Sequence, residues 1–239
     1  MNGPFLNEQQ ITVNSAWLAK VLAIIALLLL TVSLIAALTS GLANPSDMSG
    51  FRRFLYVDAE NNAPTYFSVV LMIMNALLLA TLAVRTAHSG SNLYPYWAGL
   101  SLGFFCMGFD ESFEIHERFM KPMRKLIGED DLGIFYYSWV IPALLLIAFL
   151  GLLFWRFLAA IRDTTRLRLI VAGTLYLGGA IGAEMLGGWY VERNSQANVG
   201  YLFIVTAEEG LEMAGLIALF WAVLRHHRDE FGAVRLQFS

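Results

Sequence analysis

The residues best suited to chemistry are acidic side chains that interrupt long apolar segments. Four carboxylates and one histidine lie within residues 109–117, at the end of one apolar run. Three more carboxylates interrupt the last apolar run at residues 208–212, and Glu184 interrupts the run before it. Because an ionised carboxylate is costly inside a bilayer, such residues indicate a functional site by default.

The composition does not fit an ordinary soluble enzyme. Hydrophobic residues make up 57% of the 239 residues and charged residues only 15%, and several apolar runs approach the length of a membrane span. The net charge of -3, without Lys/Arg clusters among aromatic residues, does not favour a nucleic-acid partner. Cys106 is the only cysteine, which excludes an intrachain disulfide and a Cys-rich metal site.

The apolar runs predict an all-α fold, a polytopic integral membrane protein with one domain over residues 1–239. A helix needs about 20 apolar residues to cross a bilayer. Six runs meet or approach this length, and the expected transmembrane helices are residues 18–41, 66–86, 95–118, 132–156, 168–190 and 201–224. Two glycine pairs with a spacing of four, Gly99/Gly103 and Gly178/Gly182, are typical of close helix packing in membranes.

The distribution of Lys and Arg predicts the orientation. The side that holds the termini has nine of these residues and the other side has seven. Because basic residues are enriched in cytoplasmic loops, we expect both termini in the cytoplasm and the chain in a bacterial-type inner membrane or a plasma membrane.

Six spans would bring the acidic stretches to one depth. The helices at 95–118 and 168–190 would run outward, with their acids near the end, and the helix at 201–224 would return, with its acids near the start. All eight carboxylates would then lie in the outer half of the membrane. This coincidence of depth predicts that the three stretches form one site.

Helical geometry supports the convergence within each helix. At 100° per residue, Asp110, Glu114 and Glu117 fall within an arc of about 60°. On the same basis Glu208 and Glu212 are about 40° apart. Each helix can therefore direct two or three carboxylates into the same bundle.

Eight ionised carboxylates in a medium of low dielectric would repel one another, so either some are protonated or cations neutralise them. We predict one or two divalent metal ions; carboxylates with one histidine favour iron or manganese, with calcium or zinc as alternatives. The Glu-x-x-His spacing of soluble di-iron bundles is absent, which does not favour a di-iron assignment. The expected metal ligands are Asp110, Glu114, His116, Glu117, Glu208 and Glu212, and the expected catalytic or supporting residues are Glu111, Glu184 and Glu209.

Simpler interpretations remain open at several positions. The third span could end at Phe109, with its acids on an exposed extension. Residues 213–224 are too short to cross alone, so the acids at 208–212 must lie inside the last span or at its shoulder. His116 projects about 120° from Asp110 and reaches the same site only if the helix unwinds or faces the site edge-on. Tyr137 fits either the site or an aromatic belt at the membrane interface.

The acidic site favours a metal-dependent membrane enzyme that acts on a lipid-soluble or lipid-tailed substrate. A redox metal would make it an oxidoreductase, and a redox-silent metal would make it a hydrolase. The alternatives are a cation or proton transporter that uses the acids, and an accessory or structural subunit of a larger membrane complex. Membrane lipids, a larger complex or a homo-oligomer are the expected partners.

Overall fold

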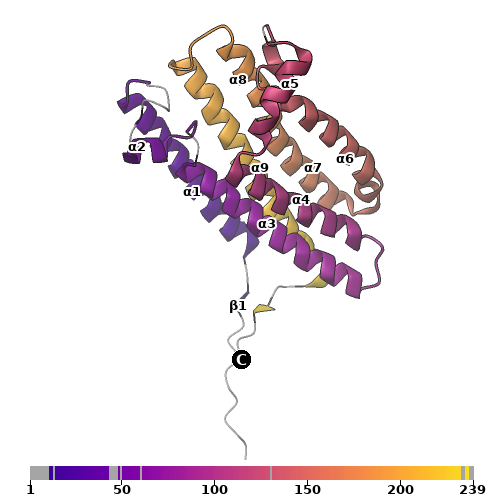
Figure 1. Ribbon diagram of the computed structural model, residues 1–239. Coiled ribbons are helices and arrows are strands. Elements are labelled where there is room, and N and C mark those ends of the chain that lie inside the picture. Colours follow the sequence, from indigo (N-terminus) through magenta and orange to yellow (C-terminus); the bar gives the residue numbers. More distant parts are fainter. Residues whose placement is uncertain are drawn as a thin grey trace, which may run out of the picture.

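The computed structural model describes residues 11–12, 14–42, 48, 50–59, 61–129, 131–232 and 235–236. Apart from two strands of two residues each, every regular element in these ranges is a helix, which confirms the predicted all-helical class. The long helices lie side by side in one elongated bundle (Figure 1).

The regular elements are introduced here in chain order. They are β1 (Ile11–Thr12), α1 (Ser15–Thr39), α2 (Gly50–Leu55), α3 (Ala63–His88), α4 (Tyr94–Phe113), η2 (His116–Phe119), α5 (Met120–Ile127), η3 (Gly133–Phe135), α6 (Val140–Ala160), α7 (Asp163–Leu177), η4 (Gly178–Ala183), α8 (Glu184–Val191), α9 (Val199–Phe231) and β2 (Arg235–Leu236). Segments η2 and η3 are 3₁₀ helices, and η4 is a π-helix between α7 and α8.

Asparagine side chains start three of the long helices. Asn14, Asn62 and Asn198 stand immediately before α1, α3 and α9, and each side chain accepts hydrogen bonds from main-chain N–H groups of the first turn. These N–H groups have no partner inside the helix, so an asparagine at this position satisfies them. Each cap fixes where the apolar run becomes helical.

Among the described residues, four helical segments are long and apolar enough to cross a membrane: Ser15–Thr39, Ala63–His88, Val140–Ala160 and Asp163–Val191. Their apolar side chains largely face outward; in the most apolar stretch of α6 only 6% of residues are buried. Such surfaces are unfavourable in water, so the helices are consistent with a multi-pass membrane location. The two other expected spans, α4 and α9, contain 20 and 33 residues but carry acidic residues that make them less apolar.

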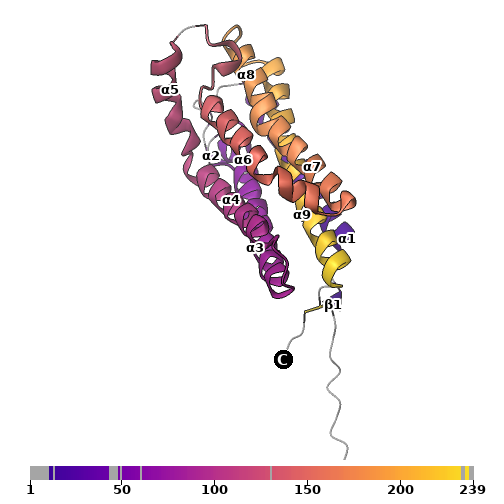
Figure 2. The same ribbon diagram turned by 90° about the vertical axis from the view of Figure 1, so that its right-hand side faces the viewer.

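Helix α9 is the central element of the bundle and packs against α1, α3, α7 and η4 (Figure 2). We call the end that holds α5 and α8 the carboxylate end, because Glu184 begins α8 there. The opposite end holds the α3–α4 and α6–α7 connections (Figure 1), and we call it the arginine end after Arg85 and Arg162. Strands β1 and β2 pair in antiparallel fashion, with Ile11 opposite Leu236, at the arginine end. The chain therefore enters and leaves the bundle side by side.

Two glycines allow α9 to approach the α7–η4 segment closely. A Cβ atom on Gly179 would lie 2.6 Å from the main-chain oxygen of Glu208, and a Cβ atom on Gly215 would lie 2.5 Å from the main-chain nitrogen of Tyr176. No real Cβ atom is tolerated at such distances from backbone. The two glycines therefore set the distance between the helices that carry Glu184 and Glu208.

The predicted packing role of Gly178 and Gly182 is wrong. A Cβ atom at either position would have no neighbour within 4 Å, whereas Gly179 lies against α9. The reason is the π-helix, whose wider turn changes which side chains face the neighbouring helix. Of the other predicted pair, Gly99 lies against Phe154, with 3.3 Å between a Cβ position and Cζ, and Gly103 lies in open space.

We expect Gly179→Ala to lower the free energy of unfolding by roughly 1–3 kcal/mol, the usual effect of overpacking. The added methyl group must push α9 away from η4. Gly182→Ala is the matched control in the same π-helix and should leave stability unchanged. Thermal unfolding of both variants in a mild detergent tests this, and equal melting temperatures would contradict the assigned packing.

Candidate functional site

A cavity of about 1200 Å³ runs between α4, α6, α7 and α9. At the carboxylate end it is lined by nine acidic residues, namely Asp58, Asp110, Glu111, Glu114, Glu117, Glu184, Glu208, Glu209 and Glu212. His116 lines the same part. At the arginine end the lining is apolar and includes Leu158, Leu169 and Leu219. The residues that the sequence analysis expected in one site, eight acids and His116, thus all border this cavity.

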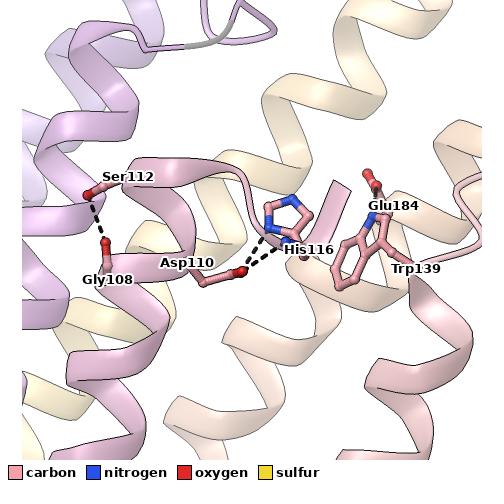
Figure 3. A network of polar contacts seen from close by, with 6 residues as sticks. All are labelled: Gly108, Asp110, Ser112, His116, Trp139 and Glu184. Carbon is pink, nitrogen blue, oxygen red and sulfur yellow. Dashed lines mark hydrogen bonds and ion pairs between the residues drawn. The ribbon is translucent and has the colours of Figure 1, made fainter. Parts of the chain in front are cut away.

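The acidic end of α4 is unwound. The helix ends at Phe113, short of the expected end at residue 118, and Glu114 adopts a left-handed conformation with φ 51°. Asp110 Oδ1 accepts a hydrogen bond from the main-chain N–H of His116 at 2.9 Å, and Asp110 Oδ2 lies 2.8 Å from His116 Nδ1 (Figure 3). The Asp110 side chain therefore holds His116, which lies just beyond the end of the helix.

This unwinding changes the predicted geometry of the acids. Asp110, Glu114 and Glu117 do not lie on one continuous α-helix, so the arc of about 60° calculated for one helix does not apply to them. Glu114 instead accepts a hydrogen bond from Asn61 Nδ2 at 2.8 Å, and Glu117 lies in η2. The unwinding also brings His116 to the cavity, which was the condition under which it could join the site.

A chain of contacts ties the unwound segment to α6 and α8. The ring of His116 lies beside that of Trp139, with 4.7 Å between their centroids. Trp139 Nε1 donates a hydrogen bond to Glu184 Oε1 at 2.9 Å (Figure 3). Asp110, His116, Trp139 and Glu184 thus connect α4, η2, the start of α6 and α8 across the acidic part of the cavity.

Five glutamates form the interior of the acidic part, and each lies within electrostatic range of others in the group: Glu111, Glu184, Glu208, Glu209 and Glu212. These glutamates come from α4, α8 and α9, so the acidic side chains of all three helices converge in the cavity. Glu111 belongs to this interior group, whereas the neighbouring Asp110 is directed to His116. The sequence analysis expected Asp110 as a metal ligand and Glu111 as a catalytic or supporting residue.

His116 lies in η2, beyond the end of α4, and its pKa is raised. Burial alone lowers the pKa of an imidazole, because it disfavours the charged form. The hydrogen bond and the negative charge of Asp110 act in the opposite direction and outweigh burial, with Glu111 and Glu117 adding to them. The pairing therefore favours a protonated imidazolium at the edge of the acidic part.

Asp58 and Tyr201 are cavity residues that the sequence patterns did not reveal. Tyr201 Oη donates a hydrogen bond to Asp58 Oδ1 at 2.9 Å and lies 3.3 Å from Tyr137 Oη. Asp58 follows α2, in a connection whose composition resembles any polar loop. Its position beside the acids is evident only in the folded chain. Of Asp58, Tyr137 and Tyr201, the sequence analysis considered only Tyr137 for the site.

We infer that the cavity opens sideways between α6 and α7. Leu146 and Leu150 of α6, and Ile170 and Leu177 of α7, line the cavity and have exposed side chains. We call this the lateral opening. Because its side chains are apolar and belong to helices apolar enough to cross a membrane, the opening faces the region that lipid chains would occupy.

Helix α6 is attached to the bundle mainly at its two ends. At the arginine end Phe157 packs on Trp97, with 4.8 Å between ring centroids, and both side chains are buried. At the carboxylate end Ser138 Oγ, just before the helix, donates a hydrogen bond to the main-chain oxygen of Met120 at 3.0 Å. The middle of α6 borders the cavity instead, which explains why the space persists there.

Within the described ranges, no group of three or more His, Cys, Asp or Glu side chains is arranged to hold a metal ion. The carboxylates surround the acidic part of the cavity without meeting at one point. The predicted metal site therefore remains a prediction.

A family model described as a domain of unknown function, DUF8692, matches residues 21–227. The chain belongs to this family. No curated protein and no solved structure matches it. The DUF8692 region includes every residue that lines the cavity, from Arg53 to Leu219, so the acidic part and the lateral opening both belong to the family domain.

We expect Asp110→Asn to lower the pKa of His116, because the substitution removes the negative charge that stabilises the imidazolium. Nuclear magnetic resonance titration of labelled histidine measures this, with the His116 signal assigned by its loss in His116→Gln. Glu129→Gln, an exposed acid outside the cavity, is the control and should leave the titration unchanged. An equal pKa in wild type and Asp110→Asn would show that the pair does not set the charge of His116.

Proposed function

We propose that this protein is a metal-dependent membrane enzyme that acts on a lipid-tailed substrate. One observation carries the proposal: a single continuous cavity joins nine carboxylates at one end to an apolar section with a lateral opening. A substrate with a polar head and a hydrocarbon tail matches both parts. The tail would lie between α6 and α7, and the head would reach the acids.

Divalent metal ions would neutralise the interior glutamates and activate the substrate head or a water molecule. Glu208 and Glu212 are one helical turn apart on α9, and Glu111 and Glu184 approach them from α4 and α8. Glutamate side chains are flexible, so these carboxylates can move together around a bound ion. Carboxylate ligands with a histidine favour iron or manganese over zinc or calcium, and His116 would have to lose its proton to join them.

The arginine end of the cavity favours an enzyme over a transporter. Beyond the apolar lining, a cluster of packed hydrophobic residues includes Leu79, Trp97, Phe157 and Val223. Buried His226 lies against Trp97, but neither His226 nor His227 lines the cavity. A conducting path for cations or protons needs polar groups or water along its length. The cavity lining is acidic at one end and apolar at the other, which fits a binding chamber better than a polar path through the bundle.

The same geometry supports the membrane arrangement that we propose. With α4 and α9 crossing alongside the four apolar segments, the chain would have six spans and the acids would lie in the outer half of the bilayer. The pairing of β1 with β2 supports placing both termini on one side, which the Lys and Arg distribution assigns to the cytoplasm. Substrate would then reach the site from the outer leaflet.

We expect protein purified in mild detergent to contain roughly one or two metal ions per chain, as carboxylate-rich helical sites do. Glu208→Gln/Glu212→Gln should lose most of this metal, whereas Glu129→Gln should retain it. Elemental mass spectrometry measures the content, and circular dichroism checks that the variants are folded. Metal-free wild type, after purification without chelators and reloading with iron, manganese, zinc and calcium in turn, would remove the metal from the proposal.

We expect Gly151→Leu and Gly173→Leu to reduce the lipid bound per chain several-fold. Both glycines line the apolar section, and a Cβ atom at either would meet open space, so a leucine side chain would fill the volume of the tail. Gly103→Leu is the matched control, since Gly103 also faces open space but lies outside the cavity. Native mass spectrometry of protein released from nanodiscs measures bound lipid, and equal occupancy in all variants would place the tail elsewhere.

A further inference from the structure

We propose that the ligand of this cavity carries a positive charge on its head: the site takes a lipid-tailed ammonium compound, such as a long-chain amine. The inference rests on the proposed function in using the same cavity and a lipid-tailed ligand. It adds the chemical class of the head group, and it does not require that the metal be present.

The first argument is the excess of negative charge. Leaving aside Asp58 and Glu114, which have other contacts, seven carboxylates line the cavity. Among the lining residues that the structure describes, Arg53 and His116 are the basic ones. The acidic excess of five is larger than two divalent ions would neutralise. A phosphate or carboxylate head would increase this excess, whereas an ammonium head reduces it.

The second argument is that two acids deep in the cavity lack compensating partners. Within the described part of the chain, Glu209 and Glu212 make no hydrogen bond or ion pair through their carboxylates. Their electrostatic neighbours are all acidic: Glu111 and Glu184 for both, with Asp58 in addition for Glu209. A buried carboxylate is stable when it is protonated or paired with a cation, and a cationic ligand would let these two carboxylates remain ionised.

The third argument is that aromatic rings surround the same end of the cavity. Tyr137, Trp139, Tyr176 and Tyr201 all line it. The face of an aromatic ring attracts an organic ammonium group, and such rings are the usual recognition element for alkylated amines. Inorganic cations prefer oxygen ligands alone, so the rings and the adjoining apolar section favour an amine that carries a hydrocarbon tail.

The experiment compares probes that share a tail and differ in charge. Full-length protein in a neutral maltoside detergent, with a chelator present, is titrated with dodecyltrimethylammonium or with dodecyl phosphate. Tetramethylammonium serves as a probe without a tail. Binding is followed by calorimetry and by the tryptophan fluorescence to which Trp139 contributes. We expect the alkylammonium to bind at least about tenfold more tightly than either other probe.

Variants locate the bound probe. Glu209→Gln and Glu212→Gln each keep the side-chain shape while removing a charge, and each should weaken dodecyltrimethylammonium binding about tenfold. Glu129→Gln should leave it unchanged. Gly151→Leu should weaken binding of the tailed probe without altering the acids, which covers the case in which a glutamate variant does not fold.

Three results would overturn the inference: dodecyl phosphate binding as tightly as the ammonium probe, tetramethylammonium binding equally well, or ammonium binding that both glutamine variants retain. Metal content is measured separately on wild type, so the two proposals fail independently. Bound metal without ammonium binding would retain the enzyme proposal and reject the cationic head. Ammonium binding by protein that neither retains metal on purification without chelators nor takes it up on reloading would retain the cationic head and reject the metal.

Discussion

The close approach of α9 to the η4 π-helix is the constraint on which the acidic part depends. Carboxylates of like charge move apart unless the backbone holds them together. Gly179 leaves no room for a side chain between η4 and the main chain of Glu208, so packing energy fixes the distance that electrostatics would increase. A π-helix within a helical segment commonly marks a functional site, and here it aligns the glycine with α9 just before Glu184.

The convergence of the acids was predictable from the sequence, because it depends only on where each acid falls along an apolar run. Glu184 lies late in one run and Glu208 early in the next, and antiparallel neighbours must bring such positions together. The details that depend on local competition were not predictable. A wheel drawn for a continuous helix cannot anticipate that Asp110 binds the main chain of His116, or that a π-helix replaces Gly178 with Gly179 as the contact. The position of Asp58 in the cavity was not predictable, because loop residues show no periodic pattern that would indicate which way they face.

The two ends of the cavity have different physical requirements. At the arginine end, Trp97 packs between Phe157 and the buried ring of His226, so the chain supplies its own packing partners there. At the carboxylate end, the electrostatic neighbours of Glu209 and Glu212 are acidic, so these side chains must be protonated or balanced by a charge from outside the chain. The cation that we propose would stabilise the fold as well as take part in function, since a ligand that binds only the native state raises its stability.

Helix α6 shows how the fold can keep such a space without collapsing. A helix that packed along its whole length would close the cavity, and one that was free at either end would separate from the bundle. The aromatic contact of Phe157 at one end and the hydrogen bond of Ser138 at the other hold α6 in place. Between them, lipid chains are as apolar as the side chains they would replace, so the lateral opening costs little in a bilayer. The same opening would be strongly unfavourable in water, which favours a membrane location for the cavity.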